Sequence, residues 1–166
     1  MGEVMALQIS KNGIEIVGLG MHFDDMPVGR KFQTVGRTIT EADLVSFVNA
    51  TGFTEVLFTN TEFLREESDI KGRLVPGALV LSFAEGLLMQ AAMQYTGFAF
   101  LEMEMKIHQP TLVGHTIHVV CEVTESRPSK SRPDRGLVRT HNTVYNQLGE
   151  ILMTYTPLRF VKRVAQ

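Results

Sequence analysis

The sequence predicts a single α+β domain, residues 1–166, in which a largely antiparallel β-sheet wraps one long apolar helix. The helix is predicted over residues 78–93, where apolar side chains occupy nearly every face. A helix that is apolar all round has to be enclosed by other elements. After Gly97 the apolar residues recur at every second position, which is typical of half-buried strands. Short connections between these runs favour antiparallel pairing.

Composition and charge exclude several classes of protein. The chain has 166 residues, of which 44% are hydrophobic and 20% charged, and this suits one globular domain. A net charge of −2 gives no bulk electrostatic attraction to nucleic acid. Cys121 is the single cysteine, so we expect neither a disulfide within the chain nor a zinc cluster. No metal or cofactor is expected, and a reducing cytoplasm is the expected location.

Signals at the ends of segments define the predicted helices. Thr40 and Asp43 form a capping-box pattern, and Gly52 is a C-terminal stop signal. A short helix is expected over residues 62–66, and Pro76 suits the first turn of the long helix. That helix is not expected to span a membrane, because a carboxylate in its middle opposes insertion by a few kcal/mol. The N-terminus lacks a basic segment followed by an apolar one, so no secretory signal is expected.

Strand-like runs of alternating polarity follow the long helix at residues 101–107, 117–123, 137–145 and 151–161. A turn is expected at 147–150, between the last two runs. The connection 125–136 is longer and locally basic. One enclosed helix combined with such a meander is the hot-dog arrangement, in which the sheet wraps around the helix.

Several motifs, in a fixed order, resemble one family. The first helix ends in Thr51-Gly52, a short charged helix follows, and KGRLVPG at 71–77 opens the apolar helix. QPTLVGHTI at 109–117 and SKSRPDRG at 129–136 come later. Over residues 23–160 the chain resembles the MaoC-like acyl dehydratases, relatives of the R-specific enoyl-CoA hydratases. The resemblance implies the hot-dog fold and an acyl-CoA ligand or substrate.

The resemblance also implies particular catalytic positions. Members of that family hydrate a trans-2-enoyl-CoA to a 3-hydroxyacyl-CoA, or run the reverse, with an Asp and a His as acid and base. These two positions fall on Phe53 and Phe58 here, and a phenyl ring can neither take nor give a proton. The family's backbone donor to the thioester carbonyl falls on Gly77, where a helix N-terminus carries partial positive charge. The alternative is that Pro76-Gly77 merely opens a buried helix.

Two carboxylates are candidate replacements for the missing base. Glu55 takes the family's Asn position, where an apolar pocket would raise its pKa; the alternative is a solvent-facing side chain on a remodelled loop. Glu85 lies in the apolar helix, and hot-dog thioesterases of another branch use a helix carboxylate. The alternative is that Glu85 is paired structurally or exposed at a pocket or dimer interface. Structural or surface roles are expected for the histidines, which are His22, His108, His115, His118 and His141.

Acyl-CoA contacts are expected from two segments. The first is the helix entry, and the second is the basic connection, whose side chains suit phosphate groups. The alternative for the second segment is a solvated charged turn. The residues expected to bind acyl-CoA are Val75, Pro76, Gly77, Lys130, Arg132 and Arg135.

Three functions remain open on the sequence. The chain could be an acyl-CoA enzyme with a relocated base, either an enoyl-CoA hydratase/dehydratase or a thioesterase. It could be a non-catalytic acyl-CoA-binding module. It could be a structural subunit of a hot-dog heterodimer. The expected partners are an acyl-CoA or acyl-carrier-protein thioester and a second hot-dog chain, in a homodimer, a larger assembly or a heteromer. Neither nucleic acid nor a membrane is expected as a partner.

Overall fold

The computed structural model describes residues 8–164, and the ends of the predicted 1–166 domain lie outside the described residues. Its helical segments are the 3₁₀ turn η1 (Phe23–Asp25), α1 (Glu41–Thr51), α2 (Val56–Thr59), α3 (Thr61–Glu66), α4 (Gly77–Leu88) and the π-helix η2 (Met89–Met93). Its strands are β1 (Lys31–Gln33), β2 (Arg37–Thr38), β3 (Leu74–Val75), β4 (Gly97–Glu102), β5 (Met105–Ile107), β6 (Thr111–Leu112), β7 (Thr116–Pro128), β8 (Arg135–Tyr145), β9 (Ile151–Tyr155) and β10 (Leu158–Lys162).

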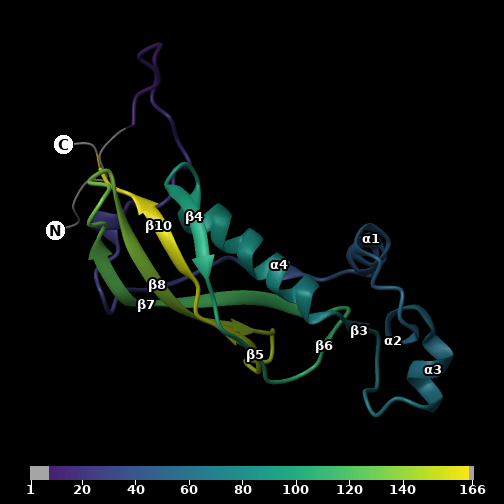
Figure 1. Cartoon of the computed structure of the whole chain (residues 1–166). Coiled ribbons are helices and arrows are strands. Elements are labelled where there is room, and N and C mark those ends of the chain that lie inside the picture. The colour runs from purple at the N-terminus through teal and green to yellow at the C-terminus, as the bar shows by residue number, and fades with distance from the viewer. Residues whose placement is uncertain (1–7, 165–166) are drawn as a thin grey trace.

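An antiparallel sheet forms the body of the molecule. Its main path runs β1-β7-β8-β10-β4, while β9 pairs with β8 and β5, and β2 pairs with β7. The long strands β7 and β8 lie at its centre, paired from His118↔Tyr145 to Pro128↔Gly136. Figure 1 shows α4 lying across one face of this sheet, with the small β3–β6 pair near its first turn. The predicted antiparallel sheet around a long helix is confirmed.

The hydrophobic core lies between α4 and the sheet. Side chains of β7 alternate between buried and partly buried, as the sequence pattern predicts. The buried residues of this strand are Ile117, Val119, Cys121 and Val123, and those of α4 are Leu79, Val80, Ala84, Leu87 and Leu88.

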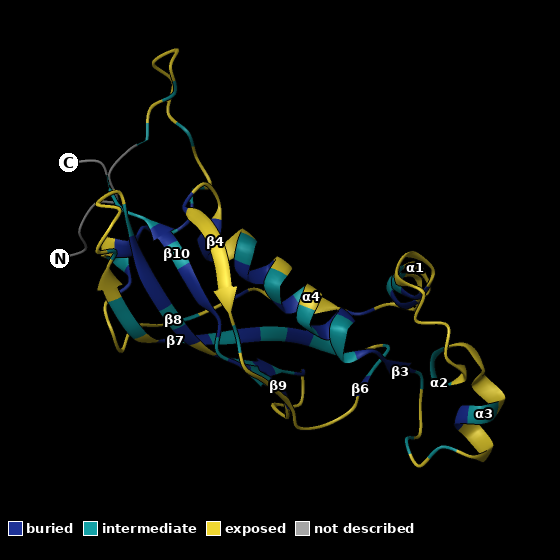
Figure 2. Ribbon diagram, in the orientation of Figure 1, coloured by how far each residue is buried: buried dark blue, intermediate teal, exposed yellow. Residues whose placement is uncertain are grey.

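The sheet covers only one side of α4. Ser82, Gly86 and Gln90 on its other side are exposed, and Figure 2 shows this side as an intermediate and exposed stripe. The predicted enclosure is therefore incomplete in the chain by itself. The helix reaches Met93 as predicted, but its last turn is the π-helix η2. Among residues 8–164, no helix is both long and apolar enough to cross a membrane.

The run predicted over 101–107 is broken in the structure. β4 ends at Glu102 and β5 starts at Met105, and every residue of both strands is exposed. β4 is the last strand on the main path of the sheet. The alternating sequence pattern of this region correctly indicates strand structure, but neither face of β4 is covered. The run 151–161 is likewise divided, since Pro157 separates β9 from β10.

A side unit of α1, α2 and α3 extends beyond the body, to the right of α4 in Figure 1. α1 starts with the predicted capping box: the Asp43 amide donates to the Thr40 hydroxyl at 3.2 Å, and the Thr40 amide donates to Asp43 at 2.8 Å. These bonds from Thr40 lower the pKa of Asp43. Arg73 joins the unit to β3, because it donates to the Glu41 carboxylate and to the Phe58 carbonyl oxygen.

A close backbone contact fixes the N-terminal segment on the end of the helix. The Gly20 amide donates to the Gln94 carbonyl oxygen at 2.7 Å, and the Met21 amide donates to the Ala92 carbonyl oxygen at 2.8 Å. A Cβ on Gly20 would lie 2.3 Å from the Ala92 carbonyl oxygen, so the two backbones would have to separate. We expect Gly20→Ala to lower the free energy of unfolding by about 2–4 kcal/mol in urea titrations.

Gly86→Ala is the matched control for this substitution. A Cβ at Gly86 would meet no other atom within 4 Å, so this variant should match the wild type or gain up to about 1 kcal/mol. A Gly20→Ala protein as stable as Gly86→Ala would contradict the close contact.

Candidate functional site

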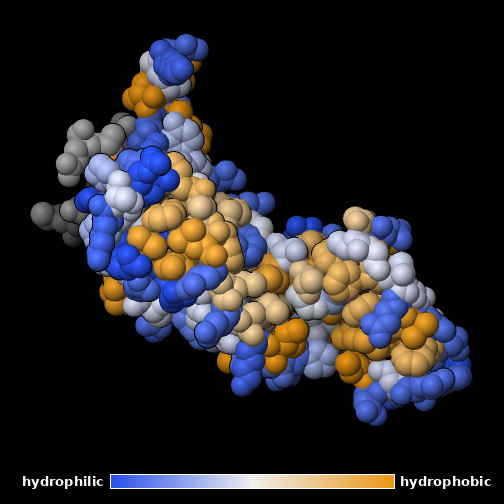
Figure 3. Space-filling view, viewed as in Figure 1, coloured by the Kyte–Doolittle hydropathy of each residue, from blue (hydrophilic) through white to orange (hydrophobic). Residues whose placement is uncertain are grey.

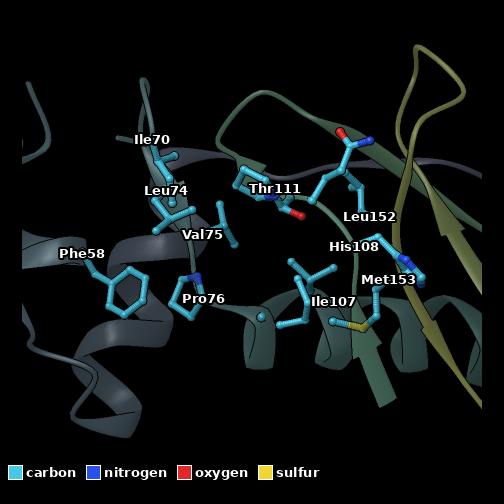
Figure 4. Close-up of a pocket in the computed structure, with 14 residues that line it drawn as sticks. Phe58, Ile70, Leu74, Val75, Pro76, Ile107, His108, Thr111, Leu152 and Met153 are labelled. Carbon is cyan, nitrogen blue, oxygen red and sulfur yellow. The ribbon is translucent and has the colours of Figure 1, made fainter. Parts of the chain in front are cut away.

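A cavity of about 320 Å³ lies at the N-terminus of α4, and we call it the slot. The side unit contributes Phe58 to one wall, the helix entry forms the floor, and strands β5, β6 and β9 form the remaining walls (Figure 4). Its lining is Phe58, Ile70, Leu74, Val75, Pro76, Gly77, Val80, Ile107, His108, Gln109, Pro110, Thr111, Leu152 and Met153. Most of these side chains are aliphatic or aromatic, so the slot is suited to an apolar group.

The first turn of α4 supplies polar backbone to the slot. The Pro76 carbonyl oxygen accepts from the Leu79 and Val80 amides, at 2.9 and 3.2 Å. The Gly77 amide has no hydrogen bond to any residue in 8–164, as is usual for the first position of a helix. Its partial positive charge favours a carbonyl oxygen or an anion. Ile107 packs over the glycine, since a Cβ there would lie 2.6 Å from its Cδ1 atom.

Aromatic rings occupy the positions where the family resemblance implies an acid and a base. Phe53 packs between Phe47 and Phe58, with ring centroids 5.5 and 6.2 Å apart. Phe58 lines the slot beside Pro76, whereas Phe53 is 40% exposed and does not line it. The part of the slot wall formed by Phe58 is therefore hydrophobic and has no proton to exchange.

Glu55 lies outside the slot. It precedes α2, is exposed, and its side chain makes no capping hydrogen bond to that helix. The structure thus does not bring Glu55 to the Gly77 amide, although it is three residues from Phe58 in the chain.

Glu85 is held in an ion pair beneath the helix. The Arg159 Nη2 atom donates to its two carboxylate oxygens at 2.7 and 2.8 Å, and the Tyr155 hydroxyl donates at 2.8 Å. The Arg159 side chain is 7% exposed and that of Glu85 is 20% exposed. Burial, and then the Glu85 charge, raise the pKa of Tyr155, so it stays a neutral donor. Glu85 does not line the slot.

Cys121 lies in the same core, beside this ion pair. Burial raises the pKa of its thiol to about 12, so at neutral pH it is not a thiolate nucleophile.

The basic connection is far from the slot within one chain. It joins β7 to β8 at the end of the sheet where the Arg163 amide donates to the Asp134 carbonyl oxygen, whereas β3 and β6 are at the opposite end (Figure 1). Arg135 is paired with Asp134 and lies over the Phe98 ring at 4.1 Å. Of the residues expected to bind acyl-CoA, the structure brings Val75, Pro76 and Gly77 into the slot, but not Lys130, Arg132 or Arg135.

His108 and Thr111 line the slot, and sequence reasoning did not select them as site residues. The His108 Nε2 atom is 2.8 Å from the Thr154 hydroxyl, and its ring lies across the cavity from Phe58 (Figure 4). His108 directly follows β5, which pairs with β9, and Thr111 lies in β6, which pairs with β3, so both reach the slot through long-range pairing and local sequence gives no signal. Within residues 8–164, no group of three or more His, Cys, Asp or Glu residues could hold a metal ion.

Comparison with known proteins identifies the family. Residues 27–155 match the family model described as FAS1-like, dehydratase domain region. No curated protein sequence gives a significant match.

Solved structures resemble the chain over most of its length. A MaoC-like dehydratase from Rhodospirillum rubrum is 26% identical, with a TM-score of 0.79 over 89% of this chain and 100% of the other. An R-hydratase from Pseudomonas aeruginosa is 19% identical, with a TM-score of 0.72 over 87% and 88% of the two chains. A Mycobacterium tuberculosis protein with a double hot-dog fold is 19% identical, with a TM-score of 0.78 over 89% of this chain and 46% of that one. The last two, at 19% identity, show a shared fold alone. The match to the family model over residues 27–155 shows that the chain is a MaoC-like hot-dog protein of the FAS1-like dehydratase-domain family.

Proposed function

We propose that the chain binds an acyl thioester in the slot without hydrating or dehydrating it by the family's Asp/His route. The observation that carries this proposal is the composition of the slot: Gly77 and Phe58 both line a largely apolar cavity, and Phe58 stands where the family resemblance implies a catalytic His. The thioester carbonyl would accept from the Gly77 amide, while the acyl chain would lie along the aliphatic walls. Each buried methylene contributes about 0.8 kcal/mol, so even a short chain gains useful affinity.

The positions of Glu55 and Glu85 count against the two enzyme alternatives, a hydratase and a thioesterase. A hydratase needs a base within hydrogen-bond reach of a water molecule next to the ligand. Glu55 is exposed outside the slot, and both Glu85 oxygens are engaged by Arg159. The same ion pair counts against a thioesterase that uses the helix carboxylate, because a base or nucleophile has to reach the substrate.

The strand β4 favours a second hot-dog chain as partner. It ends the main path of the sheet, and its exposed side chains include Phe98, Phe100 and Leu101. Figure 3 shows a hydrophobic patch over this region. An uncovered, apolar edge strand is a natural site for pairing with another chain. The resemblance to a double hot-dog protein, in which this chain matches about half the length, also supports this pairing.

A second chain would also change the role of the basic connection. Within one chain, Arg132 and Arg135 lie at the end of the sheet remote from the slot. Their proposed contact with CoA phosphates therefore requires an assembly in which a neighbouring chain brings its own connection to the slot.

The first prediction from the proposed function concerns binding without turnover. Isothermal titration with butyryl-CoA and crotonyl-CoA should show binding, while the absorbance of the enoyl thioester should stay constant over hours. Gly77→Val should weaken binding at least about tenfold, because its side chain would displace Ile107 and fill the slot. Gly86→Ala, on the exposed side of the same helix, should bind like the wild type. Turnover of crotonyl-CoA that disappears in Glu55→Gln would replace this proposal with an active hydratase.

The second prediction separates a structural from a catalytic Glu85. Glu85→Gln leaves the nearly buried Arg159 without its carboxylate, so the free energy of unfolding should fall by about 3 kcal/mol, with thioester affinity unchanged. Glu62→Gln removes an exposed partner of Arg65 and should cost less than about 1 kcal/mol. Unchanged stability together with lost ligand binding or turnover would place Glu85 in the site instead.

The third prediction concerns the β4 edge. Sedimentation analysis at tens of micromolar should give a dimer for the wild type and a monomer for Leu101→Lys, because a charge on the strand opposes pairing. Val17→Lys, at a side chain that is 80% exposed outside the sheet, should remain a dimer. A monomeric wild type that dimerises only with a different hot-dog chain would favour the heteromer. A dimeric Leu101→Lys protein would remove β4 from the interface.

A further inference from the structure

Residues 53–69, which we call the flap, contain α2 and α3 and bury little surface against the rest of the chain. Leu64 is the single buried residue of this segment. Figure 2 shows the flap as a mostly exposed part of the side unit. Segments with few buried contacts open locally at a small cost in free energy. Because the flap contributes Phe58 to the slot, its position decides whether that wall is present.

Arg73 connects the flap to the body through its guanidinium group. The Nε atom donates to the two Glu41 carboxylate oxygens at 2.9 and 3.1 Å, and the Nη2 atom is 2.9 Å from the first of them. The Nη1 atom donates to the Phe58 carbonyl oxygen. Within residues 8–164, and apart from residues within two positions of its ends, this is the one hydrogen bond between the flap and another part of the chain.

Arg73 is itself held firmly by the body. The Val113 amide donates to the Arg73 carbonyl oxygen at 2.9 Å, and the next residue, Leu74, pairs with Leu112 in β6. The Arg73 side chain is 21% exposed. Its Nε and Nη2 atoms form the fork that suits a carboxylate, which leaves Nη1 for a second partner. A lysine has no such fork and cannot reach both partners in this way.

The oxygen that Arg73 binds is at the end of a very short helix. Phe58 lies in α2, which has four residues, and carbonyl groups at a helix C-terminus lack a partner within the helix and carry partial negative charge. A hydrogen bond from a guanidinium to such an oxygen is stronger than one between neutral groups. The ring of the same residue lines the slot beside Pro76 (Figure 4). The bond at the Phe58 carbonyl oxygen therefore also positions the wall.

We propose that Arg73 is the positioning residue of the slot: it holds the flap against the body, and a ligand enters and leaves the slot when the flap releases Arg73. In the closed arrangement Phe58 completes the slot, and in the open one the slot lacks this wall. The passage of a ligand rests on the proposed binding of acyl thioesters, whereas the hold of Arg73 on the flap does not.

Ligand kinetics test the passage. The association and dissociation rate constants both scale with the fraction of open flap, while their ratio changes little as long as the closed state dominates. Arg73→Lys keeps the charge but loses the fork between Glu41 and Phe58. Surface plasmon resonance with butyryl-CoA should therefore give both rate constants about tenfold higher than in the wild type, with the dissociation constant changed by less than about threefold.

Hydrogen exchange of the free chain tests the hold on the flap without any ligand. Helices of four and six residues are not stable alone, so their amides exchange when the flap leaves the body. The bonded amides of Asn60, Leu64 and Glu67 should exchange about tenfold faster in Arg73→Lys, while those of β7 and β8 should be unchanged. Glu41→Gln leaves the bond to the Phe58 carbonyl oxygen in place and should give a smaller increase, about threefold.

Arg65→Lys is the matched control. Arg65 is paired with Glu62 and Glu66, but all three residues lie in α3, so these ion pairs do not join the flap to the body. This variant should match the wild type in flap exchange and in both rate constants. Flap exchange in Arg73→Lys at the wild-type rate would overturn the hold on the flap, and faster exchange with unchanged ligand kinetics would overturn the passage. A wild type that binds no ester would overturn the proposed function and the passage, and hydrogen exchange would still decide the hold.

Discussion

The burial of one face of α4 against the sheet positions the other parts of the molecule. The core between the helix and β7 fixes the helix axis, and the first turn then lies beside β5 and β6. Because that turn is fixed, Gly77 lines the slot. At the other end, the close contact between Gly20 and Ala92 depends on where the helix finishes. In its middle, Glu85 lies over the sheet and is paired with Arg159. The slot, the ion pair and the N-terminal contact are thus consequences of one packing arrangement.

Much of this fold could be predicted because its signals are local. The capping box at Thr40, the stop at Gly52 and the entry at Pro76 each depend on neighbouring residues. The alternation of β7 depends on a single strand with one covered face. Exposure of β4 could not be predicted, because alternation identifies a strand but does not say whether anything covers it.

Prediction of the site was limited because part of its lining is brought together by strands that are far apart in the sequence. The helix entry was assigned to the site through the family resemblance, and it does line the slot. The opposite wall arises from long-range pairing, such as Ile107↔Met153 and Val75↔Thr111, which no local pattern encodes. The charges of the basic connection are visible in the sequence, but its distance from the slot is set by the length of β7 and β8.

An uncovered β4 has a consequence for the behaviour of the protein at different concentrations. Phe98 and Phe100 stand beside a row of backbone groups that no described strand pairs with. Such an edge adds strands from any chain that offers one, including misfolded copies. If a folded partner covers it, apparent stability rises with protein concentration by mass action. The strand would then link solubility to assembly, because chains produced in excess of such a partner would keep this edge exposed to aggregation.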